Sequence, residues 1–461
     1  MSETAVTKTF NRWWVVVGAL VIQVSLGAVY IWSVFQTSLR ASFPSWSETM
    51  VTLPAQIVLA SFALAVILAG RIQDKFGPRQ VATAGGIILG TGLMLAGLTS
   101  AFQPGAALAW LIFTFSILGG VGIGAAYVCP IATCVKWFPD KRGLITGLAV
   151  AGFGAGAFFF APLARGLVSG TPYSLFGVSL FQLPQLGVFH TFFTLGVIFL
   201  IAVVAGAQLL RNPPPGFIPP EWSPPQPAPG VTQKVDFGPR EMLCTPVFWI
   251  LWLTYFAGCT AGLQVIMKAS PIWESYQMSA LQNPIAAASV ERVMTLGALA
   301  VSILAIFNAA GRILWGKISD NIGRKTTLMI MFLLCGIAML LLDYMRTYPL
   351  FLIGICLIGL CFGGYLAIYP AVTADFFGTK HLGVNYGWMF TAYGAGGLFG
   401  PYLAARLMQV MDSIPYYEVV EGDIRESFFE AGNYRPAFLV AGVACLAAAI
   451  LVSIVRKPTS S

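Results

Sequence analysis

The stretch GRIQDKFGPR at residues 70–79 decides how this chain folds, because it joins two long apolar segments through a short, charged turn. The same pattern returns at residues 316–325 as GKISDNIGRK, where Asp320 lies 246 residues after Asp74. Glycines in such a turn permit a sharp reversal of the chain and a close approach of helices. The recurrence predicts a chain made of two similar halves.

A second set of matches supports this division. Three glycines and one aromatic residue recur 240 residues apart, and the pairs are Gly147 and Gly387, Phe153 and Tyr393, Gly154 and Gly394, and Gly156 and Gly396. A proline-rich segment lies between the halves, and proline is excluded from helix interiors, so we expect an extended tether there. The predicted division is a six-helix half at residues 1–210, a cytoplasmic linker at 211–243 and a six-helix half at 244–461.

The composition is that of a membrane protein. Of the 461 residues, 57% are hydrophobic and 10% are charged, whereas about a quarter of the residues in a soluble domain are charged. A spanning helix needs roughly 20 apolar residues to cross about 30 Å of hydrocarbon. We predict an all-α membrane fold with twelve spans, near residues 12–36, 48–72, 79–99, 107–134, 142–168, 185–210, 246–270, 291–316, 325–345, 348–372, 384–408 and 435–456.

The distribution of charge predicts the topology. With both termini cytoplasmic, 17 of the 26 Lys and Arg residues fall on the cytoplasmic side and eight fall outside, as the positive-inside rule requires. We therefore expect a multi-pass protein of the cell inner (plasma) membrane. The net charge of +8 is explained by this topology, so it does not indicate binding to nucleic acid.

Several segments carry a resemblance to a known family. The G-x-x-x-D-x-x-G-x-R pattern at 70–79, with its partner at 316–325 that ends in Lys325, resembles the major facilitator superfamily. More narrowly, NRWWVVVGALVIQVSLGAVYIWSVF (11–35), KWFPDKRGLITGLAVAGFGAG (136–156), EMLCTPVFWILW (241–252) and ADFFGTKHLGVNYG (374–387) resemble the oxalate:formate antiporter family. The resemblance covers residues 11–456, apart from the linker and the loops near 169–184 and 409–434. It implies a carboxylate transporter with two pseudo-symmetric halves.

The resemblance also implies a role for the two charged turns. In that family they hold the halves together on the cytoplasmic side, so we expect Asp74, Arg79, Asp320 and Arg324 to act in gating. The simpler alternative is that the basic residues there only set the topology. Both interpretations place these residues at the cytoplasmic ends of helices.

Arg312 is the one cation within an apolar segment. It lies five residues before Lys317, about 7.5 Å along a helix, so its side chain could instead extend to the headgroups. Intramembrane cations, however, usually face a bundle interior and mark a functional site. Asn308 lies one turn earlier, where a carboxylate partner would otherwise be placed. We expect Arg312 to bind the carboxylate of a substrate, with Asn308 nearby.

The number of buried cations predicts the charge of that substrate. In relatives that carry oxalate, the resemblance places a second cation at the position that Tyr393 occupies here. A dianion beside a single cation would leave a buried negative charge without compensation, which is costly. A monocarboxylate is therefore favoured. Tyr30, Tyr127 and Tyr393 are candidate hydrogen-bond donors to it, although core packing would also suit tyrosines at these positions.

We predict a secondary transporter of small organic anions, formate-like or lactate-like, that works by alternating access with anion exchange. The alternatives are a proton-coupled monocarboxylate symporter, an oxalate:formate antiporter and a non-transporting membrane carboxylate sensor. No catalytic constellation, metal cluster or cofactor motif occurs in the sequence, and the eight cysteines lack the spacing of a metal site. We expect a monomer in the lipid bilayer whose partners are the anion and, in the symport alternative, protons.

Overall fold

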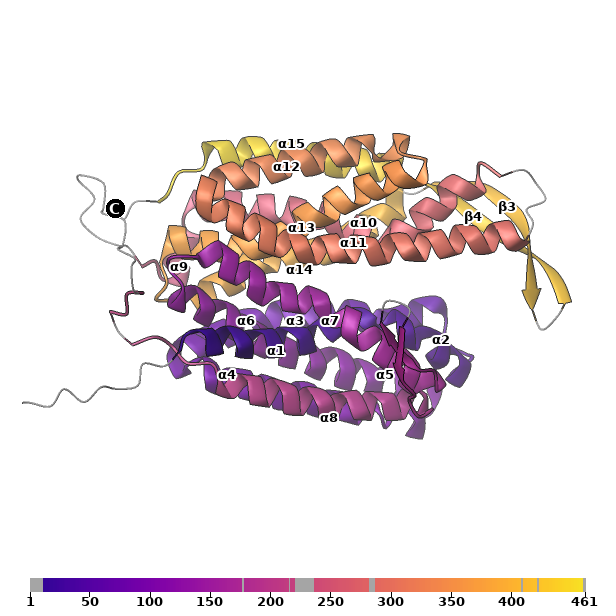
Figure 1. Ribbon diagram of the computed structural model, residues 1–461, viewed down its shortest axis with the longest axis horizontal. Coiled ribbons are helices and arrows are strands. Elements are labelled where there is room, and N and C mark those ends of the chain that lie inside the picture. Colours follow the sequence, from indigo (N-terminus) through magenta and orange to yellow (C-terminus); the bar gives the residue numbers. More distant parts are fainter. Residues whose placement is uncertain are drawn as a thin grey trace, which may run out of the picture.

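Two bundles of long helices lie side by side in the structure, a computed structural model (Figure 1). It describes residues 11–175, 178–214, 216–219, 236–281, 287–407, 409–420 and 423–458. One bundle is formed by the early helices of the chain and the other by the late ones. The helical character predicted from hydropathy is confirmed.

The first bundle contains six spans, of which the first and fourth are built from consecutive short helices. The spans are formed by α1 (Trp13–Leu26), η1 (Gly27–Ile31) and α2 (Ser33–Ser42); α3 (Glu48–Phe76); α4 (Pro78–Ala96) and η2 (Thr99–Ala101); α5 (Pro104–Leu111), η3 (Ile112–Leu118) and α6 (Gly119–Trp137); α7 (Arg142–Ser169); and α8 (Gly187–Gln208).

The second bundle repeats this plan with six long helices. A short helix, α9 (Pro239–Leu243), precedes α10 (Pro246–Met278), α11 (Ala287–Ile322), α12 (Arg324–Leu341) with η4 (Leu342–Tyr344), α13 (Tyr348–Phe377), α14 (Leu382–Leu407) and α15 (Arg435–Ile454). The predicted turns are present in both bundles, with Gly77 and Gly323 at φ of 91° and 88°. These left-handed conformations explain why glycine is required at both positions.

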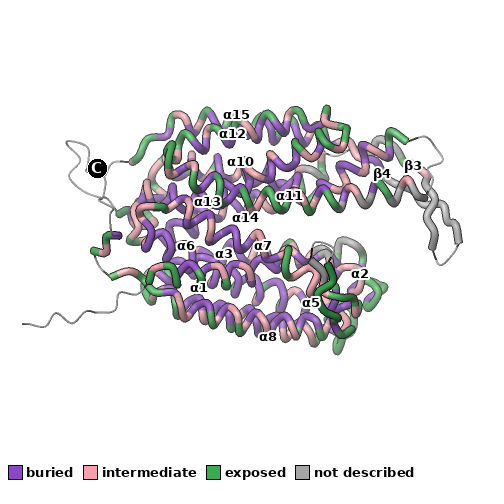
Figure 2. Tube along the Cα trace, viewed as in Figure 1, coloured by how far each residue is buried: buried purple, intermediate pink, exposed green. Residues whose placement is uncertain are grey.

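Eleven of the described helical segments are long and apolar enough to cross a membrane. The twelfth predicted span corresponds to α14, which has 26 residues but contains Asn385, Tyr386, Tyr393 and several glycines. Large apolar side chains on the outer faces are exposed, for example Leu68 and Ile450, while buried positions line the helix contacts (Figure 2). A surface on which large apolar side chains are exposed is expected of a protein that is surrounded by lipid.

Two loops that the sequence left without secondary structure form β-hairpins. Strands β1 (Tyr173–Leu175) and β2 (Val178–Phe181) pair between α7 and α8, and β3 (Gln409–Val420) and β4 (Asp423–Asn433) pair between α14 and α15. Both hairpins lie at the same end of the molecule, which we call the hairpin end (Figure 1). We call the opposite end, with Gly77 and Gly323, the terminal end.

The two bundles meet along two equivalent helix pairs, α3 with α14 and α7 with α11. Small residues allow the backbones to touch: a Cβ at Gly147 would overlap the carbonyl of Arg312, and a Cβ at Gly387 would lie 2.9 Å from the carbonyl of Val66. Glycine contacts of this kind bring membrane helices close together. The two pairs correspond through the repeat, because Gly387 follows Gly147 by 240 residues and Arg312 follows Val66 by 246.

Candidate functional site

Two aspartates fasten the bundles to each other at the terminal end. The carboxylate of Asp74, at the end of α3, accepts hydrogen bonds from the backbone N–H groups of Gly383 and Val384 at 3.1 and 3.0 Å. These are among the first N–H groups of α14, which have no partner within that helix. A carboxylate is therefore stabilised there both by hydrogen bonds and by the helix dipole.

Asp320 makes the equivalent contact from the second bundle to the first. Its carboxylate, near the end of α11, accepts from Gly143 N–H and Leu144 N–H of α7, both at 2.9 Å. The two contacts are related by the internal repeat. The donors Gly143 and Leu144 precede the donors of the Asp74 contact by 240 residues, and the acceptor Asp320 follows Asp74 by 246 residues. We refer to the two contacts, Asp74 on α14 and Asp320 on α7, as the carboxylate latches.

Ion pairs surround the Asp320 latch. Arg324 lies 2.7 Å from the Asp320 carboxylate and donates to Asp375 at 3.0 Å, while Arg142 of the other bundle also donates to Asp375. Three of the predicted gating residues, Asp74, Asp320 and Arg324, thus lie at the junction of the bundles. Arg79 does not, since its Nε donates to Gln208 within the first bundle at 2.7 Å.

Arg312 is completely buried, with 0% of its surface exposed. Its Nη1 crosses to the first bundle and donates to the carbonyl oxygen of Val150 on α7 at 2.6 Å. Its Nε and Nη2 atoms have no hydrogen-bond partner, and within the described part of the chain no carboxylate lies within ion-pair distance of it. Arg312 therefore presents uncompensated charge and two free donors, which a planar carboxylate can satisfy.

The guanidinium has room because of a glycine on the facing helix. A Cβ added at Gly154 of α7 would lie 3.2 to 3.4 Å from the Cζ, Nε and Nη2 atoms of Arg312. The guanidinium therefore packs against the α7 backbone, with Cζ, Nε and Nη2 nearest to Gly154. This places the free donors at the interface between the bundles.

Tyr30 and Tyr393 meet across the same interface. Their hydroxyl groups, from η1 and α14, are 2.6 Å apart, a hydrogen bond that joins the two bundles. The ring of Tyr30 also packs edge-on against Phe153 at 5.4 Å between centroids, and Phe153 precedes Gly154, the residue that faces Arg312. Two of the predicted site tyrosines are thereby brought together beside Arg312.

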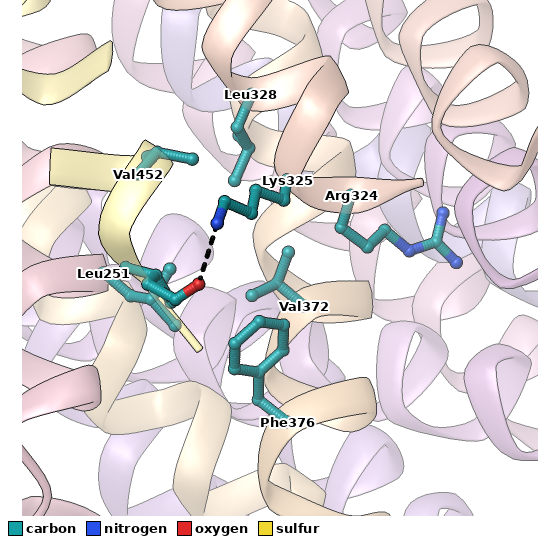
Figure 3. Close-up of a pocket in the computed structure, with 8 residues that line it drawn as sticks. Leu251, Arg324, Lys325, Leu328, Val372, Phe376 and Val452 are labelled. Carbon is teal, nitrogen blue, oxygen red and sulfur yellow. Dashed lines mark hydrogen bonds between the residues drawn. The ribbon is translucent and has the colours of Figure 1, made fainter. Parts of the chain in front are cut away.

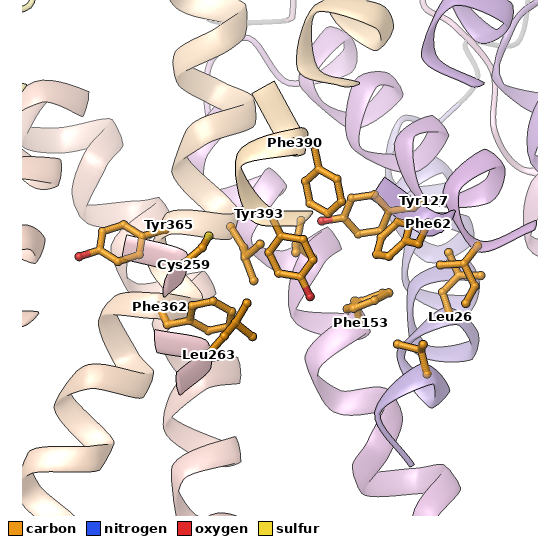
Figure 4. Close-up of a cluster of buried hydrophobic side chains, with 14 of the residues drawn as sticks. Leu26, Phe62, Tyr127, Phe153, Cys259, Leu263, Phe362, Tyr365, Phe390 and Tyr393 are labelled. Atoms are coloured by element: carbon orange, nitrogen blue, oxygen red, sulfur yellow. The ribbon is translucent and has the colours of Figure 1, made fainter. Parts of the chain in front are cut away.

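Tyr127 belongs to an aromatic cluster that lies between these groups. Its ring packs edge-on against Phe62 and Phe153 at 5.0 and 5.3 Å between centroids, and tilted on Phe390 at 4.9 Å. Tyr127 and Tyr393 come from opposite bundles and both extend toward the interface (Figure 4). Arg312 also acts on the Tyr127 hydroxyl. The cluster gives this part of the interface apolar walls with a few hydroxyl groups, the usual composition of a small-ligand site.

Asn308 lies one turn from Arg312 as expected, but it packs against another helix. Its backbone carbonyl and its Oδ1 lie beside Gly363 of α13, and Oδ1 has no hydrogen-bond partner. Among the described residues, then, the structure brings together Arg312, Tyr30, Tyr127 and Tyr393 and places Asn308 on the α13 side of the group.

Sequence reasoning missed several of the groups found here. The Val150 carbonyl could not be identified, because a backbone acceptor has no sequence signal. Buried tyrosine hydroxyls also occur at Tyr255 and Tyr386, and that of Tyr386 lies close to those of Tyr127 and Tyr255. Their residue type and depth were the available signal, since a tyrosine deep in a membrane helix usually needs a partner for its O–H.

A cavity in the second bundle does not resemble an anion site (Figure 3). It is lined mainly by aliphatic side chains from α10, α12, α13 and α15, including Leu251, Leu328 and Val372. Lys325 donates to the carbonyl of Val455 at 3.2 Å, and Arg324 points away toward its ion pairs. Both cations at the cavity are therefore already satisfied.

The chain resembles known membrane transporters along most of its length. It is 29% identical to an uncharacterized MFS-type transporter, YhjX, of Escherichia coli (84% of this chain, 86% of the relative). It is 28% identical to the oxalate:formate antiporter of Oxalobacter formigenes (86% and 85%) and 27% identical to the apicoplast pyruvate carrier 1 of Toxoplasma gondii (82% and 73%).

Solved structures and family similarity lead to one assignment. The fold matches the proton:xylose symporter XylE with a TM-score of 0.65 and 12% identity over 95% of this chain and 94% of the symporter. It matches the transporter FucP with a TM-score of 0.63 and 12% identity (97% and 99%). The sequence model of the Major Facilitator Superfamily matches residues 9–300 and 293–461, which together cover both bundles. The chain is a membrane transporter of the Major Facilitator Superfamily.

Proposed function

We propose that this transporter exchanges small monocarboxylates across the membrane by alternating access. The observation that carries the proposal is Arg312, a buried cation at the interface of the bundles with two free donors and no carboxylate partner among the described residues. A buried charge without a partner is costly, so a bound anion would relieve an existing penalty. The relatives named for oxalate, formate and pyruvate transport support carboxylates as the substrate class.

A substrate with one negative charge fits the site best. Arg312 is the one cation in the group, and Tyr393, Tyr30 and Tyr127 add neutral hydroxyls around it. One carboxylate would neutralise one guanidinium, whereas a second carboxylate would remain unpaired in an apolar site. Formate and lactate are suitable representatives of this class.

The orientation follows from the charges at the two ends. We place the terminal end in the cytoplasm of the cell inner membrane, because basic residues are concentrated on that side. With the carboxylate latches formed, the described structure is closed at that end. Access to Arg312 would then be from the hairpin end, and opening of the latches would release the substrate to the other side. The proposed transporter acts as a monomer.

The test is counterflow in proteoliposomes with wild-type protein and Arg312→Gln. We expect the substitution to lower formate and lactate counterflow by roughly 100-fold, the effect of losing one partner of a buried ion pair. The matched control is Arg346→Gln, because Arg346 is exposed and pairs with Asp343 away from the site. A parallel series with an imposed pH gradient distinguishes exchange from proton symport. Retention of counterflow by folded Arg312→Gln protein would overturn the proposal.

A further inference from the structure

The β1–β2 hairpin presents apolar side chains at the surface of the first bundle. All four residues of β2 are exposed. The large apolar ones, Val178, Leu180 and Phe181, have 60%, 56% and 53% of their surface accessible. A contiguous group of exposed apolar side chains usually marks a contact with a partner or with lipid.

The segment around this hairpin carries no charge. Residues 166–189 contain no Asp, Glu, Lys, Arg or His. The β3–β4 hairpin lies at the same end of the molecule, but residues 409–433 contain six acidic residues and one arginine. Charged side chains normally cover a surface that faces water. The composition of β3–β4 thus suits water, and that of β1–β2 suits an apolar environment.

Contacts that follow β2 attach the hairpin to the outer part of α7. The side chain of Leu183 is buried against Gly166, where an added Cβ would overlap it. The backbone N–H of Leu186 donates to the carbonyl oxygen of Leu167 at 2.7 Å. The hairpin is therefore fixed to α7, and its exposed side chains keep a defined place beside that helix.

A hydrogen bond from β1 shows how far the hairpin folds back along α7. The hydroxyl of Tyr173 donates to the carbonyl oxygen of Phe159 at 3.3 Å. Phe159 lies about 15 Å along the helix before its end at Ser169. The 28 residues of α7 extend about 42 Å, which exceeds the hydrocarbon thickness by about 12 Å. Even if the whole excess lies on the outer side, Phe159 is within the hydrocarbon.

The hairpin contacts the face of α7 that is turned away from the second bundle. Gly147 and Gly154, seven residues apart on one face of α7, lie against Arg312. Phe159 and Gly166, also seven residues apart, lie about 140° around the helix from that face. Phe159 is 42% exposed there. In Figure 1 the magenta strands of the hairpin lie at the flank of the first bundle, short of the tip at α2.

We propose that the β1–β2 hairpin is an interfacial anchor, which inserts Val178, Leu180 and Phe181 among the acyl chains of the leaflet at the hairpin end. The ring of Tyr173 stacks on that of Phe181 at 5.1 Å between centroids, and aromatic rings are enriched at this level of a membrane. An uncharged hairpin binds lipid through its apolar area, so its insertion needs no anionic lipid. Because it is fixed to α7, the hairpin holds the outer part of that helix at a constant depth.

The test measures the depth of single nitroxide labels on the full-length protein in phosphatidylcholine nanodiscs. The labels are attached in Val178→Cys and Leu180→Cys, each in a Cys244→Ser background, because Cys244 is the exposed one of the eight cysteines. Oxygen concentrates among acyl chains, whereas a nickel chelate stays in water. We expect collisions with oxygen to exceed those with nickel severalfold at both sites. Adding anionic phosphatidylglycerol should leave this ratio unchanged.

Ser413→Cys is the matched control, because Ser413 is an exposed residue of the acidic hairpin at the same end. Collisions with nickel should exceed those with oxygen there. Leu180→Asp, observed from the label in Val178→Cys, should raise collisions with nickel severalfold, since a charge is excluded from acyl chains.

Three results would each overturn the proposal. Collisions with nickel above those with oxygen at Val178 or Leu180 would place the hairpin in water. Protection of both sites from both reagents would show that protein, such as a second copy of the chain, covers the hairpin. An unchanged nickel collision rate in folded Leu180→Asp protein, with folding checked by thermal unfolding, would show that the apolar side chain does not hold the hairpin in lipid.

Discussion

Arg312 combines features that rarely occur together in one side chain. It is buried, permanently charged and bonded through Nη1 alone, to the carbonyl of Val150 in the opposite bundle. That hydrogen bond directs the guanidinium, while Nε and Nη2 are left for a ligand. The side chain is therefore oriented before any anion binds, which reduces the ordering cost of binding.

Gly154 should control how well Arg312 binds its ligand. In Gly154→Ala the new Cβ would lie 3.2 to 3.4 Å from the guanidinium, so the cation must shift by a few tenths of an ångström. We expect carboxylate affinity to fall about threefold to tenfold, while the added alanine favours the helix by about 1 kcal/mol. Binding is measured by titration and folding by thermal unfolding.

The control for this substitution is Gly119→Ala in the first bundle, where the nearest side-chain atom would be 3.7 Å from the new Cβ. It has the same effect on helix propensity without a contact to Arg312. Equal affinities of the two variants would show that Gly154 has no influence on the cation.

At the residue scale, the sequence predicted Arg312 better than it predicted the contacts of the residues around it. Arg312 was recognisable because a charge inside an apolar segment is exceptional. The pairing of Tyr30 with Tyr393 required two residues 363 positions apart to meet, which no local pattern specifies. Tyr255 and Tyr386 were missed because the approach of their hydroxyls to that of Tyr127 depends on the packed structure. The gating role of Arg79 and the substrate role of Asn308 remain predictions.

The N-terminal ends of α7 and α14 depend on side chains of the opposite bundle for their caps. Each is capped by a carboxylate from the opposite bundle, Asp320 and Asp74 respectively. A helix whose cap comes from another bundle loses that cap when the bundles separate. The capping energy therefore contributes directly to keeping the terminal end closed.

Asp74→Asn and Asp320→Asn should each weaken closure of the terminal end. We expect about 1 kcal/mol per substitution from loss of the charge at the helix terminus, and nearly twice that in the double variant. The closed population is measured by pulsed electron spin resonance with labels at Arg165 and Tyr402, which are exposed near the hairpin end of α7 and α14. Opening the terminal end should shorten this distance.

Two features of the chain make that measurement practical. Cys244 is the exposed cysteine among the eight, so a Cys244→Ser background limits labelling to the introduced sites. Asp140→Asn is the control, since Asp140 pairs with Arg12 inside the first bundle at 3.0 Å. A label distance that does not change in the double variant would contradict a role of the latches in closure.

The end of the linker is bound to the start of α14. Asp236 accepts hydrogen bonds from Thr379 N–H and Lys380 N–H at 2.9 and 3.1 Å, and the amide of Asn385 donates to the carbonyl of Phe237 at 2.9 Å. Gly378 is required here because a Cβ would overlap Asp236. This contact supports the turn that positions α14 for its latch.

Asp236→Ala should loosen this turn without unfolding the bundle. We expect amide hydrogen exchange at Thr379 and Lys380 to accelerate about fivefold to tenfold, because each loses its acceptor. Glu241→Ala is the control, since Glu241 caps only the local helix α9 through Gly238 N–H. Unchanged exchange in Asp236→Ala would show that the linker does not stabilise the turn.

At the element scale, the spans and the paired turns were predictable because their hydropathy and glycines are local properties. The β3–β4 hairpin was not, since its strands pair residues as far apart as Gln409 and Asn433. The hairpin is the connection between α14 and α15 that the sequence analysis treated as a loop. The carboxylate latches could not be predicted either, because each joins residues of opposite bundles and the sequence does not specify how the two bundles are placed relative to each other.

The molecule as a whole is nearly symmetric at its latches and asymmetric at its centre. Glycines at equivalent places bring α3 against α14 and α7 against α11, yet Arg312 corresponds to Val66. Symmetric contacts permit two alternative states of similar energy, while the single cation gives the centre one charge to neutralise. The empty carrier would then move with an unpaired positive charge, and the loaded carrier with none.

This charge balance predicts how transport responds to membrane potential. Exchange of one monocarboxylate for another uses only the neutral loaded carrier, so imposing about 100 mV across proteoliposomes should leave its rate unchanged. Net efflux without external substrate requires return of the charged empty carrier, and a unit charge crossing about 100 mV changes the free energy by about 2.3 kcal/mol. Net efflux should therefore be slower than exchange, and its rate should change severalfold with the membrane potential.

The measurement uses potassium diffusion potentials of both signs with labelled lactate inside. Exchange that depended on potential as strongly as net efflux would show that the loaded carrier still carries a charge, and would rule out neutralisation of Arg312 by a single carboxylate.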